Sequence, residues 1–593
     1  MQRDSKDRLA VKQYLQRYSS FRFSDKNKLV TVSLSSGVVV STEDMVTCDR
    51  ADQIGCKIQE KWDEKSFGDL SLRKAEQAKT MSQLTSACSV KSEQVSVDPN
   101  ILFYRLLLVA ERENGLRECF QYELTPYPMF LFKDGLMQKP VKADLYPLFA
   151  SGLTEANLPS VVQYVVDGGY LIHKVRWNPQ MDLCNILPLF LNFLNRFHRQ
   201  VQVVFDGYDS GPSIKDQEHA RRAGKAAQVG PDRQVHIYTK NVGPQEPFLA
   251  NTANKKSFIA VLRLYLQQNG ITVHQASGDA DTMIVLVASE CARQGEIQVG
   301  VLAEDTDIFA LLLYHRDSDM ADMFFVSESK KGRADKLVGG KCINIGSIQS
   351  KIGYIVCKCM LVIHALGGCD STSVIFGHGK SSVFSKIAKS VTLQSHCMNL
   401  QLETAPLQQV CNAGMSLVVA LYGGTVGKTL AEMRYTSYCS STLSHRFQPE
   451  RLPPSESAAR MHVMRVHLQV IIWSTLGYSA INATDWGWRA ENGQLVPIQI
   501  EGDVAPEHIL KLVRCGCKGD CSSLLCSCRK HGLHCVSACR NCLGNDCSNA
   551  RSYANEIDCS DDDSDDADIP TPDFSFDIDP QFEYYEEEVL SYK

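Results

Sequence analysis

Three apolar runs, far apart in the chain, each lead into an aspartate, and this pattern constrains the fold more than any other feature. The runs span 161–166, 201–205 and 297–303, and they lead into Asp167, Asp206 and Asp305. Near-continuous apolar strands are typical of a sheet that is covered on both faces. From 161 to about 390 such runs alternate with longer amphipathic stretches, which predicts β–α units and an α/β fold with a parallel sheet.

Acidic residues recur at the predicted ends of segments. Asp279 and Asp281 precede an apolar helix predicted over 283–292, Asp307 follows Asp305 by two positions, and Asp370 lies in Gly-Gly-Cys-Asp. Taken singly, each aspartate is best explained as a helix N-cap or a turn residue. Taken together, they give seven carboxylates, and ligand sites of parallel sheets lie beyond the carboxyl ends of the strands.

Seven converging carboxylates would repel one another too strongly to stay uncompensated in a partly dry cleft. Protons or cations must neutralise them, and hard oxygen ligands favour magnesium or manganese. Two such ions about 4 Å apart can activate water and stabilise the leaving oxygen in phosphodiester cleavage. The sequence therefore predicts a site for two Mg²⁺ or Mn²⁺ ions.

The ordered acidic motifs resemble the flap endonuclease family of structure-specific five-prime nucleases, which have a PIN-like fold. The matching pieces contain Asp167, Asp206, Asp279 with Asp281, Asp305 with Asp307, and Asp370. The resemblance covers 161–390 and implies that all seven acids hold two metal ions. The chain departs from the family at Asp279 and Asp281, where many members have Glu, and by a longer segment between Asp307 and Asp370.

Basic residues and a glycine motif follow the acids. The resemblance implies that Lys215 and Arg222, seven residues apart after Asp206, orient the scissile phosphate, and their alternative role is a solvated helix face, as it is for Arg221. Gly377-His378-Gly379-Lys380 opens a predicted helix, where backbone N–H groups can approach a phosphate. Its place behind Asp370 resembles the family's helix-two-turn-helix at 370–390, which grips duplex backbone.

Nine of the 23 cysteines lie between 515 and 547. Such a density favours a shared thiolate cluster over disulfides, and three tetrahedral zinc ions would need three of the nine sulfurs to bridge. The cysteines are Cys515, Cys517, Cys521, Cys526, Cys528, Cys535, Cys539, Cys542 and Cys547. Three zinc ions and nine thiolates carry a charge of −3, which seven Lys and Arg against two Asp in 511–555 offset.

The spacing of these cysteines resembles the tesmin-type CXC domain, a zinc-cluster DNA-binding module. It departs where Cys539-Arg540-Asn541-Cys542 stands in place of Cys-x-Cys. In the DNA-binding interpretation Lys518, Arg529 and Lys530 contact phosphates, and the alternative is a purely structural zinc knot. His531 and His534 are expected at the surface because cysteines already satisfy the metals.

Charge and composition divide the rest of the chain. Residues 556–588 hold 15 Asp and Glu and no Lys or Arg, and without 556–593 the net charge changes from −6 to +8. This predicts a disordered acidic tail. It is either a solubility tail or a mimic of nucleic acid that competes for a basic groove, in which case its deletion should tighten DNA binding at low salt.

The remaining regions are less informative. Residues 1–150 have no predicted function, 391–510 read as helices broken at Pro453-Pro454, and 511–550 form the zinc module. Cys357, Cys359 and His364 are expected to be buried structural residues, and Trp486 and Trp488 core residues rather than base-stacking ones. The chain lacks an apolar run of about 18 residues and an N-terminal signal peptide, which favours the nucleus or the cytosol.

The sequence thus predicts a divalent-metal nuclease that acts on branched or single-stranded DNA. The whole arrangement resembles uncharacterised animal proteins that join the two kinds of domain, and this resemblance implies a mobile-element origin. The alternative is a DNA-binding regulatory or scaffold protein whose nuclease fold is inactive. Nothing in the sequence separates DNA from RNA as the substrate, and the oligomeric state stays open.

Overall fold

The computed structural model describes most of residues 98–140, 162–215, 230–327 and 341–550. It also describes shorter pieces at 21–23, 29–31, 50–63, 87–90 and 93–96. The predicted acidic tail at 556–593 lies outside the described residues, as do Arg221 and Arg222. Residues up to 550 form one compact unit, which is the part described below.

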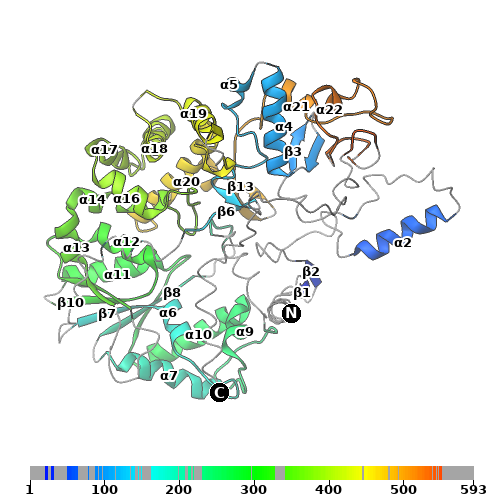
Figure 1. Cartoon of the computed structure of the whole chain (residues 1–593). Helices are drawn as coiled ribbons and strands as arrows, with labels where there is room; N and C mark the ends of the chain where they lie inside the picture. Colours follow the sequence, from blue (N-terminus) through cyan, green and yellow to red (C-terminus); the bar gives the residue numbers. More distant parts are fainter. Residues whose placement is uncertain are drawn as a thin grey trace, which may run out of the picture. The chain divides into compact units, whose positions relative to one another are not determined.

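A six-stranded sheet is at the centre of this unit (Figure 1). Its order is β12-β11-β10-β7-β8-β9, and every neighbouring pair is parallel except β11 and β12. The strands are β7 (Val162–Asp167), β8 (Val201–Phe205), β9 (Thr272–Gln275), β10 (Gln298–Leu302), β11 (Met323–Ser327) and β12 (Lys341–Asn344). The predicted parallel sheet is confirmed, and three of its strands coincide with the apolar runs that lead into aspartates.

The strand order reverses between β7 and β10. The chain moves outward from β7 through β8 to β9, returns to the other side of β7 as β10, and moves outward again through β11 to β12. The connections that leave β7 and β10 therefore run in opposite directions, which makes the carboxyl ends of these two strands a switch point. Ligands of open α/β sheets bind at such a switch point.

Helices cover both faces of the sheet (Figure 1). Successive residues of β7 point to opposite faces of the sheet, so both faces are buried: Tyr164 and Val166 face one buried cluster and Val165 faces the other. The first face carries α6 (Gly168–Lys174), α7 (Leu183–Asn195), α9 (Gln245–Ala250) and α10 (Thr252–Gln268). The second face carries α11 (Asp281–Gln294), α12 (Thr306–His315) and α13 (Ile345–Ile352).

Further helices extend the second face without a break in the core at residue 390. The buried cluster that contains α12 continues through Leu417 of α18 to Val466 of α20. The helices after α13 are α14 (Tyr354–Lys358), α15 (Met360–Leu366), α16 (Lys380–Ala388), α17 (Val391–Asn399), α18 (Leu407–Leu421), α19 (Leu430–Leu443) and α20 (Glu456–Ser474). The helices predicted for 391–510 are therefore confirmed as far as residue 474.

Residues after α20 differ from the helical prediction. β13 (Trp488–Glu491) and β14 (Gln494–Pro497) form an antiparallel hairpin. Its Trp488 is 1% exposed and packs in the core, as expected for this residue, while Trp486 is half-buried against the same cluster. The Asn492-Gly493 pair between the strands is a strong hairpin signal.

The N-terminal region contributes α4 (Pro99–Arg112), which contains the apolar stretch from Ile101 to Val109. Its apolar face joins the buried cysteines of the C-terminal module in one core, which we call the α4–cysteine core and which contains Leu102, Phe103, Leu106, Cys515, Cys528, Cys535 and Cys539 among others. Short elements complete this part: α2 (Ala51–Trp62), α5 (Leu116–Cys119), α21 (Glu507–Leu512), α22 (Ser527–Lys530), and the strand pairs β1–β2 (Phe21–Phe23, Leu29–Thr31), β3–β4 (Ala87–Val90, Glu93–Ser96) and β5–β6 (Phe132–Lys133, Leu136–Met137). Among the described residues no helix is both long and apolar enough to cross a bilayer.

A buried ion pair links the N-terminal region to the helical region. Arg434 Nη1 lies 3.7 Å from Glu123 Oε1, with both side chains at most 5% exposed. Arg434 also donates to the Glu123 carbonyl oxygen, and Ser455 Oγ donates to Glu123 Oε2 at 2.6 Å. Both charges are therefore buried and held by several hydrogen bonds.

Arg434→Met should destabilise the protein by about 3–5 kcal/mol, because it leaves the Glu123 charge buried and unpaired. Urea unfolding followed by circular dichroism measures the free energy of unfolding. Arg489→Met is the matched control, since Arg489 pairs with Glu491 on the exposed hairpin and should change stability by no more than about 0.5 kcal/mol. Equal stability of the two variants would contradict the structural role of the buried pair.

Candidate functional site

Four of the predicted acids lie at or just after the carboxyl ends of β7, β8 and β10, and they are Asp167, Asp206, Asp305 and Asp307. Asp167 is the last residue of β7, and its Oδ1 accepts the Gly169 N–H at 2.7 Å as the N-cap of α6. Asp305 caps α12 in the same way, through the Asp307 N–H. Asp206 follows β8, and its Oδ1 accepts the Ala280 N–H at 3.2 Å. Capping uses one carboxylate oxygen of Asp167 and Asp305, so it does not exclude a second role for these residues.

The other three acids reach the same place from loops and helix starts. Asp279 and Asp281 stand where the chain passes from β9 into α11, and Asp370 lies in the loop after α15. Asp307 and Asp370 are 4% and 7% exposed, whereas Asp279 remains exposed. The acids thus range from buried to exposed.

The electrostatic interactions show that all seven carboxylates share one neighbourhood. Asp167 interacts with Asp206 and Asp305, and Asp206 interacts with Asp279. Asp281 interacts with Asp279, Asp305 and Asp307, and Lys215 interacts with Asp279, Asp281, Asp307 and Asp370. We call this set the carboxylate cluster: Asp167, Asp206, Asp279, Asp281, Asp305, Asp307 and Asp370. The structure thus brings together seven acids that were predicted at the ends of separate segments. Their role as metal ligands stays a prediction.

Burial and mutual repulsion shift the titration of the cluster. Burial and then the Asp206 charge raise the pKa of Asp167 to about 7. Burial, followed by the charge of Asp279, raises the pKa of both Asp206 and Asp281. Ionising these carboxylates together therefore costs free energy. A bound cation would lower this cost because it attracts the negative charges.

Lys215 provides positive charge inside the cluster. Its Nζ lies 2.5 Å from Asp279 Oδ2 and 3.4 Å from Asp281 Oδ2. Burial lowers its pKa, but the surrounding carboxylates outweigh burial and raise the pKa well above the usual value. Lys255 of α10 also acts on Asp206. Lys215 thus lies at the site where it was expected, while its predicted partner Arg222 lies outside the described residues.

Two further residues lie beside the cluster: His364, which is a buried helix residue as expected but contacts an acid of the cluster, and Lys139, which the sequence analysis did not name. His364 is fully buried in α15, and its Nε2 lies 2.7 Å from Asp307 Oδ1. Burial lowers the pKa of His364, so the neutral ring donates this hydrogen bond. Lys139 Nζ donates to the Asp370 carbonyl oxygen at 2.8 Å. An ionisable residue within the apolar run 360–366 was the available signal for His364, whereas nothing local marked Lys139.

Glycine is required after Asp206 because two loops meet there. A Cβ on Gly207 would lie 2.1 Å from the Ser277 carbonyl oxygen, and the Gly207 N–H donates to the Gly278 carbonyl oxygen at 2.6 Å. This contact ties the β8 end to the loop that carries Asp279. The glycine therefore sets the distance between two members of the carboxylate cluster.

Gly207→Ala should cost about 1–3 kcal/mol of stability, since backbone on both sides must move to admit a methyl group. Chemical denaturation measures the loss. Gly211→Ala is the control, because nothing lies within 4 Å of a Cβ at that exposed glycine. If both variants unfolded at the same denaturant concentration, the close approach of the two loops would be wrong.

The glycine motif before α16 differs in part from its predicted role. Gly377 has φ +76°, with nothing within 4 Å of an added Cβ, and Gly379 is the N-cap residue of α16. Gly377 is thus exposed and Gly379 half-buried, so the backbone of the two glycines is at least partly accessible. Lys380, however, is 1% exposed and packs against Gly367, so a phosphate contact by its side chain is not supported.

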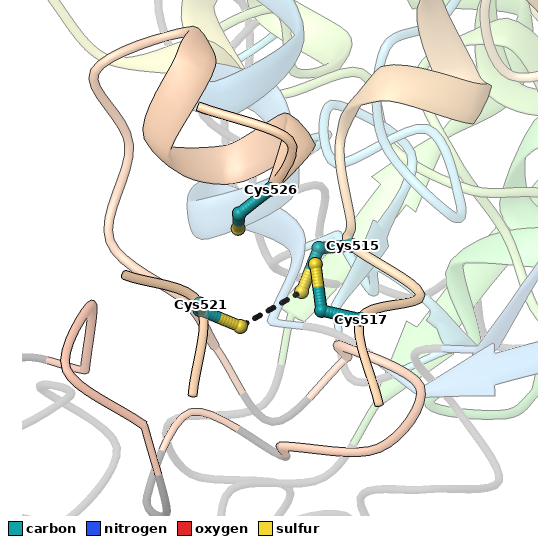
Figure 2. Close-up of side chains that lie close together, drawn as sticks. All are labelled: Cys515, Cys517, Cys521 and Cys526. Carbon is teal, nitrogen blue, oxygen red and sulfur yellow. Dashed lines mark hydrogen bonds between the residues drawn. The ribbon is translucent and has the colours of Figure 1, made fainter. Parts of the chain in front are cut away.

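The cysteines form the second candidate site, and Figure 2 shows four of them, Cys515, Cys517, Cys521 and Cys526, close together. Three groups of four have sulfurs within 4.8 Å of one another: Cys515, Cys517, Cys521 and Cys526; Cys515, Cys526, Cys528 and Cys535; and Cys515, Cys521, Cys535 and Cys542. Cys539 lies 3.6 Å from Cys528, and Cys547 makes a side-chain contact with Cys535. All nine predicted cysteines therefore lie in one cluster.

The distances between these sulfurs fit zinc. Cys515 Sγ lies 3.8 Å from the sulfurs of Cys521, Cys535 and Cys542. Four sulfurs bound tetrahedrally at about 2.3 Å from one zinc ion lie about 3.8 Å apart. Among the described residues only cysteines form groups this tight, so the carboxylate cluster is the looser of the two sites.

The basic residues of the module have different surroundings. Lys518 and Lys530 are exposed, as a phosphate contact requires. Arg529 instead donates to the Cys521 and Ser548 carbonyl oxygens, so its guanidinium is used within the module. His534 is exposed as expected, but His531 is 4% exposed because Glu113 and Ser527 contact its ring, and its predicted surface position is wrong.

Comparisons with known proteins give partial matches. A family model described as a domain of unknown function (DUF8702) matches residues 1–123, and no curated protein matches the chain. The catalytic core of Rad2 in complex with DNA substrate is similar at 18% identity and a TM-score of 0.25, over 39% of this chain and 61% of that one. The eukaryotic junction-resolving enzyme GEN-1 is similar at 16% identity and a TM-score of 0.30, over 57% of this chain and 62% of that one. The chain thus spans 61% of the length of the first of these structures.

Proposed function

We propose that the chain is a divalent-metal-dependent nuclease that cleaves phosphodiester bonds in DNA. The observation that carries the proposal is the carboxylate cluster at the switch point of a parallel sheet. Burial and repulsion raise the pKa of Asp167, Asp206 and Asp281, so this cluster is costly without a cation. The ordered motifs around the seven acids, which resemble the flap endonuclease family, point to the same chemistry.

The donor set fits magnesium or manganese, since every cluster member offers carboxylate oxygen. Asp305, Asp307 and Asp370 would hold one ion, and the other four acids would hold a second ion and its water shell. Such ions supply a water of lowered pKa and charge stabilisation for the leaving oxygen. His364 orients the Asp307 carboxylate by its hydrogen bond, as outer-shell donors do for metal ligands.

The chain's own groups would position the nucleic acid. Lys215 lies among the acids and can bind a phosphate once a cation satisfies Asp279 and Asp281. Arg222 would supply the planar fork that a lysine lacks. Gly377 and Gly379 offer backbone N–H groups to a duplex, and Lys518 and Lys530 of the cysteine module add contacts to phosphates. In this proposal the zinc-bound module supplies DNA affinity, and the protein acts in the nucleus.

The test is incubation of the purified chain with labelled flap, hairpin, duplex and single-stranded DNA, with and without Mg²⁺. Matched RNA substrates decide between the two nucleic acids. We expect Mg²⁺-dependent cuts in branched or single-stranded DNA. Tight DNA binding with no cleavage of any substrate would overturn the nuclease proposal and leave a DNA-binding scaffold.

A further inference from the structure

The cysteine module does not stand alone, because α4 of the N-terminal region covers it. Leu102, Phe103 and Leu106 of α4 share the α4–cysteine core with the cysteine sulfurs. The two segments are about 400 residues apart in the sequence. The buried sulfurs are thus enclosed partly by a helix that the sequence gives no reason to connect with them.

Arg105 of α4 inserts its charge into this core. The residue is 6% exposed. Its Nε and Nη2 donate to the Val513 carbonyl oxygen at 3.0 Å and 2.6 Å, and its Nη1 donates to the His534 carbonyl oxygen at 2.7 Å. Its Nη2 also lies 3.1 Å from the Cys528 sulfur. The guanidinium therefore holds the chain on both sides of the cluster and touches one of its sulfurs.

The charge of Arg105 has no acidic partner there. Within the described part of the chain no carboxylate pairs with it, since its contacts are two carbonyl oxygens and one sulfur. A buried charge is costly unless an opposite charge accompanies it. The group that can carry negative charge against this guanidinium is the Cys528 sulfur, as a thiolate.

A second contact in the same place supports a fixed docking of α4. Glu113, just after α4, lies 3.4 Å through Oε1 from His531 Nε2. Gly532 has φ +64°, and a Cβ there would lie 2.7 Å from Arg112 Nη2. The module thus meets the end of α4 at van der Waals distance, so the Arg105 contact belongs to an extended interface.

We propose that Arg105 is the charge partner of the cysteine-bound zinc: it hydrogen-bonds the Cys528 thiolate and offsets part of the cluster's negative charge, so that α4 and the module bind metal as one unit. This rests on the proposed zinc binding. Arg105 is a positioning residue, because it acts on the metal through Cys528. An outer-shell donor such as Arg105 would orient the Cys528 sulfur and strengthen metal binding.

The test compares zinc release from the full-length chain and from Arg105→Met, with a chromophoric chelator in excess. Loss of an outer-shell partner typically weakens metal binding 10–100-fold, so we expect Arg105→Met to release zinc at least about tenfold faster. Arg105→Lys restores the charge without the fork and should release zinc at an intermediate rate. Arg489→Met is the control, because this exposed arginine pairs with Glu491 on the β13–β14 hairpin, outside the α4–cysteine core.

A second readout separates charge from mere packing. In the cobalt-substituted protein, the sulfur-to-cobalt absorption bands should shift in Arg105→Met and stay unchanged in Arg489→Met. If Arg105→Met does not fold, Arg105→Gln serves the same test with a neutral polar side chain. Release from the neutral variants within twofold of the parent chain, or from Arg105→Lys no slower than from them, would overturn the inference. A parent chain that holds no zinc would instead overturn the zinc proposal on which it rests.

Discussion

Asp206→Asn should abolish Mg²⁺-dependent cleavage while it stabilises the metal-free protein. The substitution keeps an oxygen to accept the Ala280 N–H and removes the charge. Metal ions contribute several kcal/mol to the transition state, so the loss of one ligand should slow cleavage about a thousandfold or more. Gel assays on the preferred substrate measure the rate, and thermal unfolding with and without Mg²⁺ measures the stability.

The rise in stability follows from the direction of the pKa shift. Burial and the neighbouring Asp279 raise the pKa of Asp206 in the folded state, so its ionised form disfavours folding. Asparagine removes this penalty at neutral pH. For the same reason Mg²⁺ should raise the Tm of the parent chain and have a smaller effect on the variant.

In the parent chain, the cost of ionising the buried carboxylates should appear as a pH dependence of the free energy of unfolding. Asp167 has a pKa of about 7 in the folded state, against about 3.9 for an unperturbed aspartate. The folded state therefore holds this proton more tightly than the unfolded state does. The free energy of unfolding of the metal-free protein should be highest below about pH 4 and should fall as the pH rises to about 7. Added Mg²⁺ should flatten the fall.

Asp319→Asn is the matched control, because Asp319 is an exposed aspartate that belongs to no part of the carboxylate cluster. It should cleave at the parental rate and melt at the parental temperature. Full cleavage by Asp206→Asn would remove the carboxylate cluster from the chemistry. An unchanged metal-free Tm in that variant would contradict the charge repulsion that the structure indicates.

The site could be predicted from the sequence to the extent that local pattern fixes it. Apolar runs gave the strands β7, β8 and β10, and parallel pairing carries the residues at their carboxyl ends to one edge. The convergence of Asp167, Asp206 and Asp305 is therefore a consequence of topology. The β13–β14 hairpin was within reach as well, because Asn492-Gly493 marks its turn.

Contacts between distant segments were not predictable. His364 reaches Asp307 only because α15 packs across α12, and Lys139 reaches the Asp370 loop across 231 positions. His531 is buried because Glu113 and α4 lie over it, which no property of the cysteine spacing reveals. Burial of Lys380 likewise depends on Gly367, which has no side chain to exclude it. In each case the partner is set by tertiary packing rather than by local pattern.

Cys515→Ser should remove the zinc from the cysteine module and unfold the module. Cys515 belongs to all three groups of four sulfurs, so its loss leaves every group with three (Figure 2). Structural zinc sites supply about 10–16 kcal/mol of apparent binding free energy, which here is folding free energy of the module. Elemental analysis should find the zinc content of about three ions reduced to less than one, and limited proteolysis should cut within 511–550.

The carboxylate site should survive this change, because the sheet and its helices pack in two clusters that contain no cysteine of the module. Cys515→Ser should thus keep the Mg²⁺-dependent rise in Tm and lose DNA affinity, since the exposed Lys518 and Lys530 lose their scaffold. Cys184→Ser, at an exposed cysteine of α7, controls for the loss of a thiol. A variant that retained all of its zinc would show that Cys515 is not the shared ligand. A variant that lost its zinc but kept full DNA affinity would assign the module a structural role, with DNA bound at the sheet.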